Sequence, residues 1–180
     1  MRIIGGDFKS RIFTPGKNFK ARPTTDFARE NLFNILINRY NLEDKKILDL
    51  FSGTGSISFE FVSRGCRDVT SVELDRFHHQ FINSVIDKLG IKGSLKALNT
   101  DVFKFITRSP GQYDLIFADP PYELSRIEDI PDLILNSKLL NENGLFILEH
   151  GKSNNFSAHP MFREIRIYGS VHFSFFSGDK

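Results

Sequence analysis

Short apolar runs alternate along most of the chain with segments that carry apolar residues at helical spacing. The apolar runs are short and bounded by glycine or polar residues, which predicts strands at 47–51, 69–73, 94–98, 113–118 and 144–149. The segments between them predict helices at 56–64, 76–89, 101–106 and 127–135. Two last runs, 164–168 and 171–176, are separated only by Gly169-Ser170 and predict a tight antiparallel hairpin.

Alternating strands and helices are typical of an α/β fold with a doubly wound, mostly parallel sheet. We therefore expect a seven-stranded sheet that closes with the C-terminal antiparallel hairpin, over residues 41–180. Residues 1–40 predict a small N-terminal extension. In it, Arg2-Ile3-Ile4 and residues 11–14 form a hairpin around Gly5-Gly6, and a helix runs from Thr24 or Thr25, as N-cap, to about Arg39.

Composition restricts the class of protein. A chain of 180 residues with 40% hydrophobic and 26% charged residues is ordinary for a globular domain. The single cysteine, Cys66, excludes an internal disulfide and a cysteine-cluster metal site. No apolar run reaches the roughly 18 residues of a membrane span, and the N-terminus lacks the apolar core of a signal peptide. We expect a cytoplasmic protein that needs no membrane and no metal, and a monomer.

Positive charge is concentrated at the N-terminus. Residues 1–29 contain seven basic and two acidic residues, a net charge of +5, whereas the remainder has 17 basic and 20 acidic residues, a net charge of −3. A basic segment beside a mildly acidic body is typical of a surface that faces a polyanion, although a soluble charged hairpin has the same composition.

The most informative motif is Asp119-Pro120-Pro121-Tyr122, directly after the predicted strand 113–118. Two consecutive prolines fix two φ angles and remove two backbone donors, so the loop is stiff. A carboxylate, a fixed carbonyl and an aromatic ring at the end of a strand can hold a flat heterocycle and accept hydrogen bonds from its exocyclic amine. The ring of Tyr122 would then stack on the heterocycle, with packing at the sheet edge as its structural alternative.

Other candidate ligand residues follow the other predicted strands. Asp49-Leu50-Phe51-Ser52-Gly53-Thr54-Gly55 forms a glycine turn that opens a helix, but it lacks the third glycine of a dinucleotide site. Glu73 ends the next strand, where a ribose-binding carboxylate is expected, and Asp75 is predicted to cap the helix that follows. Asp101 follows the third strand, either as an acceptor for an adenine amine or as an ordinary N-cap. All of these strand ends are expected at the carboxyl edge of the sheet, where such folds bind ligands.

Together these motifs resemble those of S-adenosylmethionine-dependent amino-methyltransferases with a class I, Rossmann-like fold. The match is closest to the bacterial RsmD family, which methylates a guanine N2 in 16S ribosomal RNA of the small subunit. The segments that are similar to this family are 1–6, 22–26, 29–36 and 49–55, and the resemblance covers essentially the whole chain. Phe51 departs from the common methyltransferase pattern, because it stands where many members have a glycine.

The resemblance implies roles for individual residues. S-adenosylmethionine would be the cofactor, and its binding residues would be Asp49, Phe51, Gly53, Gly55, Glu73, Leu74, Asp101 and Val102. The target base would be held by Asp119, Pro120 and Tyr122. The partner would be 16S ribosomal RNA, within the small subunit or an assembly intermediate, contacted by Arg2, Lys9, Arg11, Arg22, Thr25 and Arg29.

Two other classes of function remain open at this stage. Adenine N6 in DNA or RNA offers the same kind of exocyclic amine, so the Asp119-Pro120-Pro121-Tyr122 loop alone does not choose between the two bases. A DNA enzyme of this kind would usually carry a separate target-recognition insert, and no segment here is long enough for one. A non-catalytic RNA-binding module is the third possibility, but three acids at a cofactor edge would repel phosphate.

Overall fold

The computed structural model describes residues 1–16 and 24–178 of the 180-residue chain. Its helices and strands follow the predicted order, with boundaries mostly within one or two residues of those expected. In chain order they are α1 (Asp26–Arg39), β1 (Lys46–Leu50), α2 (Ser56–Ser63), β2 (Asp68–Glu73), α3 (Arg76–Leu89), β3 (Leu95–Asn99), α4 (Val102–Arg108), β4 (Tyr113–Ala118), the 3-10 turn η1 (Ile127–Asp129), α5 (Ile130–Leu135), β5 (Leu140–His150), β6 (Phe162–Tyr168) and β7 (Val171–Ser177). Among the described helices, none is both long and apolar enough to cross a membrane.

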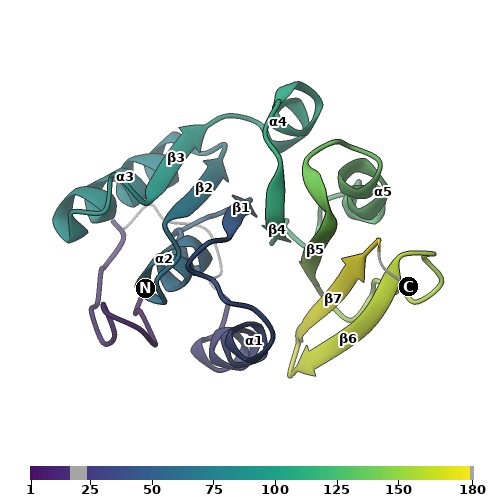
Figure 1. The fold of residues 1–180 in the computed structure, drawn as a ribbon, viewed down its shortest axis with the longest axis horizontal. Helices are drawn as coiled ribbons and strands as arrows, with labels where there is room; N and C mark the ends of the chain where they lie inside the picture. The colour runs from purple at the N-terminus through teal and green to yellow at the C-terminus, as the bar shows by residue number, and fades with distance from the viewer. Residues whose placement is uncertain (17–23, 179–180) are drawn as a thin grey trace.

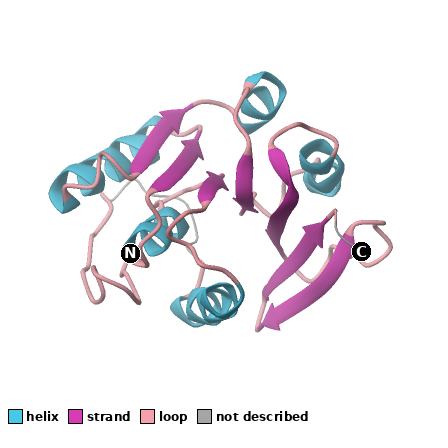
Figure 2. Ribbon diagram, viewed as in Figure 1, coloured by secondary structure: helices cyan, strands magenta, loops and turns pink. Residues whose placement is uncertain are grey.

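One seven-stranded sheet runs diagonally across the molecule in the order β3-β2-β1-β4-β5-β7-β6 (Figure 1). Strands β1 to β5 pair in parallel, and β7 pairs antiparallel with both β5 and β6. Figure 2 shows helices on either side of this sheet, with α4 and α5 above it and α1 and α2 below it in this view. The expected doubly wound sheet and the closing hairpin around Gly169 are therefore confirmed.

Two hydrophobic cores lie on the two faces of the sheet. Successive residues of a strand point to opposite faces, so neighbouring positions belong to different cores. Ile47 and Leu115 pack with α1, α2 and α3, whereas Leu48 and Ile116 pack with α4 and α5. Both faces of the central strands are thus buried, which explains why these strands are continuous apolar runs without polar alternation.

The N-terminal helix is built into the first of these cores. Thr25, not Thr24, is its N-cap, since the Thr25 hydroxyl accepts a hydrogen bond from the backbone N–H of Ala28 at 3.2 Å. Leu32 and Phe33 of α1 are fully buried and share a core with residues of the sheet. Residues 24–40 are consequently packed against the sheet and are not an independent appendage.

The expected N-terminal hairpin is present as a short antiparallel pairing around a bridge between Arg2 and Ile12. The N–H of Ile3 donates to the Arg11 carbonyl at 3.0 Å, and the N–H of Phe13 donates to the Met1 carbonyl at 2.9 Å. Two backbone donors at the tip of the hairpin bind helix α2. The N–H of Asp7 donates to the Ser63 carbonyl at 2.7 Å, and that of Phe8 donates to the Ser63 hydroxyl at 2.9 Å. The predicted hairpin therefore forms, and the residues at its tip are held by hydrogen bonds to α2.

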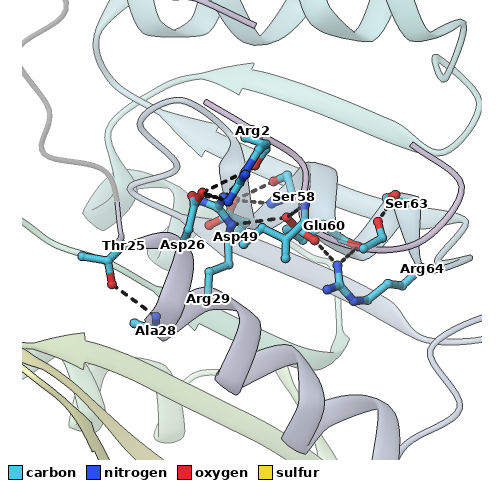
Figure 3. A network of polar contacts seen from close by, with 12 residues as sticks. Arg2, Thr25, Asp26, Ala28, Arg29, Asp49, Ser58, Glu60, Ser63 and Arg64 are labelled. Carbon is cyan, nitrogen blue, oxygen red and sulfur yellow. Dashed lines mark hydrogen bonds and ion pairs between the residues drawn. The ribbon is translucent and has the colours of Figure 1, made fainter. Parts of the chain in front are cut away.

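A buried ion-pair network joins this segment to α1 and α2 (Figure 3). Its centre is Glu60 of α2, which is fully buried. The Glu60 carboxylate accepts a hydrogen bond from the N–H of Ile4 at 2.6 Å, lies 3.3 Å from Nε of Arg29, and pairs with Arg64. Arg29, only 1% exposed, also donates to the Arg2 carbonyl at 2.6 Å. The network fixes the N-terminal segment on the face of the sheet that α1 and α2 cover.

Replacing Glu60 by alanine should lower the free energy of unfolding by about 3–5 kcal/mol, because Arg29 and Arg64 would keep buried positive charge without their partner. Chemical denaturation of the purified variant measures this loss. Glu43→Ala is the matched control, since Glu43 pairs with Arg67 where both side chains are more than half exposed. It should cost less than about 1 kcal/mol. Equal losses in the two variants would contradict the importance of the buried network.

Candidate active site

Acidic residues gather at one edge of the sheet. Strands β2, β1, β4 and β5 are parallel neighbours, so their carboxyl ends lie side by side. Each of them carries an acid at or next to this end: Glu73, Asp49, Asp119 and Glu149 respectively. The expected gathering of strand-end carboxylates at the carboxyl edge follows directly from this topology.

The glycine turn after β1 needs unusual backbone conformations. Gly53 and Gly55 have φ values of 52° and 73°, in the left-handed region that favours glycine. A Cβ at Gly55 would lie 2.9 Å from a ring carbon of Phe59, so no side chain fits there without displacing that ring. Phe51 also has a positive φ of 58°, which explains why glycine is the usual residue at this position of the motif.

Asp49 supports the turn from within the protein. It is almost fully buried, and one carboxylate oxygen accepts hydrogen bonds from the Ser58 N–H at 3.1 Å and the Ser58 hydroxyl at 2.6 Å. These bonds hold the start of α2 against the end of β1. Burial raises the pKa of Asp49 to about 7, against the opposing effect of the Ser58 donors.

Glu73 is joined to the same turn. One of its carboxylate oxygens accepts a hydrogen bond from the N–H of Gly53 at 2.7 Å, and the other accepts from the N–H of Asp75 at 2.7 Å. Asp75 caps α3, as expected, through the N–H groups of Phe77 and His78. These two bonds orient the carboxylate, and each oxygen keeps a second lone pair for a ligand hydroxyl.

The remaining predicted cofactor residues lie beside Glu73. Leu74, the residue after β2, has a side chain that is 63% exposed to solvent. Asp101 caps α4 by accepting a hydrogen bond from the N–H of Lys104 at 2.9 Å, which is the ordinary role that the sequence had left open. Val102 is buried in the core on the side of α4 and α5.

The Asp119-Pro120-Pro121-Tyr122 loop is fixed to neighbouring strands. The N–H of Asp119 donates to the carbonyl of Leu50 at 3.2 Å, so the loop starts beside the residue that leads into the glycine turn. The Pro121 carbonyl closes a turn by accepting from the N–H of Leu124 at 2.8 Å. The loop is held at both ends, in agreement with the stiffness expected from two prolines.

A second carboxylate lies beside Asp119. The hydroxyl of Thr24 donates to Oε2 of Glu149 at 2.8 Å and lies 3.4 Å from Oδ2 of Asp119. The hydroxyl of Tyr122 donates to the other oxygen of Glu149 at 3.1 Å. Four residues from three distant parts of the chain thus form one hydrogen-bonded group around two acids.

Burial and like charge disfavour ionisation of both acids together. Burial is the main cause that raises the pKa of Asp119 well above its ordinary value, followed by the negative charges of Glu149 and Asp49. Burial raises the pKa of Glu149 to about 7, opposed by the hydroxyl donors of Thr24 and Tyr122 and by the charge of Arg29. Perturbed carboxylates of this kind are typical of reactive sites.

Sequence reasoning missed Glu149 and the role of Thr24. Glu149 was recognisable by the rule that selected Glu73, because it also stands at the end of an apolar strand on the carboxyl edge. Thr24 was considered only as a helix cap, and no local signal connects it to an acid 95 residues away.

The proposed RNA-contacting residues are only partly accessible. Arg29 is wrong as a phosphate contact, because its guanidinium is buried and bound to Asp26, Glu60 and the Arg2 carbonyl. Arg2 is exposed but pairs with Asp26 at 2.7 Å. The hydroxyl of Thr25 caps α1, and Lys9 and Arg11 are exposed. Arg22 lies outside the described residues.

The turn that carries Lys9 lies far from the acidic edge. Residues 7 and 8 bind Ser63, the last residue of α2. Helix α2 starts at the carboxyl edge of the sheet and runs to the opposite edge, about 12 Å away at 1.5 Å per residue. Any contact of Lys9 with RNA is therefore peripheral to the site around Asp119.

The chain is similar to known proteins in sequence and in fold. The family model described as conserved hypothetical protein 95 matches residues 1–177. The chain is 29% identical over 160 residues to ribosomal RNA small subunit methyltransferase D of Escherichia coli strain K12, covering 89% of this chain and 79% of that protein. It is 28% identical over 155 residues to the protein of the same name from Buchnera aphidicola subsp. Baizongia pistaciae, covering 86% and 78%.

A solved structure of a hypothetical protein from Thermus superimposes on 98% of this chain and 99% of its own, with a TM-score of 0.85 and 24% identity. This last likeness concerns the fold alone.

The raised pKa of Asp49 predicts a pH dependence of stability. Between its ordinary pKa of 3.8 and about 7, the folded protein holds a proton on Asp49 that the unfolded chain has lost. The contribution of Asp49 to the free energy of unfolding therefore falls as pH rises through this window.

Asparagine does not titrate and can still accept from Ser58, so Asp49→Asn should gain stability relative to the unsubstituted protein by roughly 1–4 kcal/mol between pH 4 and 7.5. Urea titrations at several pH values measure the difference. A stability difference that does not change with pH would contradict the prediction.

Proposed function

Because the chain belongs to the conserved hypothetical protein 95 family, the RsmD family of methyltransferases, we propose that it transfers a methyl group from S-adenosylmethionine to ribosomal RNA, at the exocyclic N2 amine of a guanine in the small subunit. The substrate is 16S ribosomal RNA, within the small subunit or an assembly intermediate, and the reaction takes place in the cytoplasm with the protein as a monomer.

One observation carries the proposal: the Asp119 loop starts next to the glycine turn. The N–H of Asp119 is bonded to the carbonyl of Leu50, and the next residue, Phe51, already has the positive φ of the glycine turn. A group held by the turn and a group held by the loop would thus be neighbours at the carboxyl edge of the sheet. This is the arrangement required to bring a donor and an acceptor of a methyl group together.

The residues beside the glycine turn fit a nucleoside. Glu73 offers carboxylate lone pairs for ribose hydroxyls, the exposed side chain of Leu74 offers an apolar surface for a ring, and Asp101 lies at the next strand end. Only a glycine fits at Gly55, because a Cβ there would meet the side chains of Phe59 and Ile82, so the turn keeps its backbone conformation. S-adenosylmethionine supplies a methyl group on a positively charged sulfur, and its transfer replaces a C–S bond by an N–C bond while the amine loses one proton.

The residues of the loop would make the amine reactive. An aromatic amine is a poor nucleophile, because its lone pair is delocalised into the ring. The carboxylate of Asp119 and the carbonyl of Pro120 would accept the two N–H groups, favour a pyramidal nitrogen and stabilise the positive charge that develops on it. Tyr122, 38% exposed, offers a ring on which the base would stack, and an ionised Asp119 can take up the released proton.

Asp119→Ala should lower the turnover number by about a hundredfold or more, because the acceptor for the target amine is lost, while the affinity for S-adenosylmethionine changes little. Methyl transfer to small subunits lacking the modification, followed by mass spectrometry of nucleosides, measures both rate and product. Asp87→Ala, on the exposed surface of α3, serves as the control. Turnover within a few-fold of normal would refute the role of Asp119, and N6-methyladenine as product would overturn the choice of guanine.

Exposed basic residues of the N-terminal segment should contribute to RNA affinity but not to cofactor affinity. Neutralising Lys9 and Arg11 together should weaken RNA binding and reduce the slope of log Kd against log salt by about 0.7–0.9 for each lost phosphate contact. Lys138→Ala is the matched control, since Lys138 is exposed on the turn before β5. An unchanged salt slope in the double variant would remove this segment from the RNA-binding surface.

A further inference from the structure

Glu149 occupies a central position that the chemistry described above does not use. It is the penultimate residue of β5 and is only 3% exposed. Both of its carboxylate oxygens accept hydrogen bonds from hydroxyl groups, one from Thr24 and one from Tyr122. A carboxylate buried at this depth is costly unless such bonds compensate for the lost water.

The two hydroxyls belong to segments far apart in the sequence. Thr24 lies two residues before α1, and Tyr122 belongs to the loop after β4. The Tyr122 ring is also in contact with Gly151, where a Cβ would lie only 3.1 Å from its Cδ2 atom. Glu149 and Gly151 together determine where the hydroxyl and one edge of the ring lie.

Glu149 also shapes the electrostatic surroundings of Asp119. The Thr24 hydroxyl lies within reach of both carboxylates, which places them in the same small cluster. The charged groups that act on Asp119 are Glu149 from β5 and Asp49 from β1, and Arg29 of α1 acts on Glu149. Glu149 is the larger of the two negative influences on Asp119.

We propose that Glu149 is a positioning residue of the methyl-transfer site, which holds the Tyr122 ring for stacking and, through its negative charge, controls the pH range in which Asp119 is ionised. This inference rests on the proposed function. An ionised Asp119 accepts a hydrogen bond from the target amine, whereas a protonated Asp119 has lost much of this capacity. Rate should therefore fall on the acidic side of the Asp119 pKa, and the charge of Glu149 moves this limit to higher pH.

Glu149→Gln separates charge from shape, because glutamine keeps an oxygen that can accept from Tyr122. In this variant the acidic limb of the pH–rate profile should move to lower pH by about one unit or more. Tyr122→Phe does the reverse, because it removes the hydrogen bond from Tyr122 to Glu149 and leaves the negative charge of Glu149 in place. It should raise KM for RNA and leave the acidic limb in place. Glu164→Gln, which changes the ion pairs of Glu164 with Arg39 and Arg166 on β6, is the matched control and should change neither property.

Nuclear magnetic resonance of the protein labelled with ¹³C at aspartate carboxyls tests the electrostatic part without any methyl transfer. The Asp119 resonance, assigned with Asp119→Asn, should titrate at lower pH in Glu149→Gln than in the unsubstituted protein. If this shift occurs but no guanine is methylated, the proposed function fails and the coupling of the two acids stands. If guanine is methylated but neither the resonance nor the acidic limb moves, the role of Glu149 is overturned.

Discussion

The buried carboxylate of Glu60 is the interaction on which the arrangement of the N-terminal half depends. It meets Ile4 from the first residues of the chain, Arg29 from α1 and Arg64 from its own helix. Arg29 in turn binds Arg2 and Asp26, so the start of α1 is held in one place against the sheet. Thr24, two residues before Asp26, then meets Asp119 and Glu149. A structural ion pair on one face of the sheet is in this way connected to the candidate site at its edge.

The site concentrates negative charge at a considerable energetic cost. Asp49, Asp119 and Glu149 all have raised pKa values, with burial as the main cause in each case. Burying these acids lowers the stability of the folded protein, because it must either desolvate their negative charge or bind protons that the unfolded chain releases. The hydrogen bonds from Ser58, Thr24 and Tyr122 reduce this cost without removing it. Buried acids that are kept in spite of this cost are characteristic of functional sites.

Net charge along the sequence overstated the polyanion-binding character of the N-terminal segment. Of the basic residues that give residues 1–29 their excess charge, Arg29 is buried in an ion-pair network and Arg2 pairs with Asp26. Counting residues treats all of these charges as equivalent. The exposure of Lys9 and Arg11, and their distance from the acidic edge, assign them at most a positioning contribution to RNA binding.

The sequence by itself determined the order of strands and helices, the glycine turn, the cap at Asp75, and the strand-end acids Glu73 and Asp119. These features depend on local periodicity and on residues a few positions apart, so a single pass along the chain detects them. The tertiary structure alone decided that Arg29 is buried, that residues 4, 7 and 8 bond to α2, and that Thr24 bridges Asp119 and Glu149. Thr24 and Glu149 are 125 residues apart. Their contact follows from the packing of α1 against the sheet, which local sequence patterns do not predict.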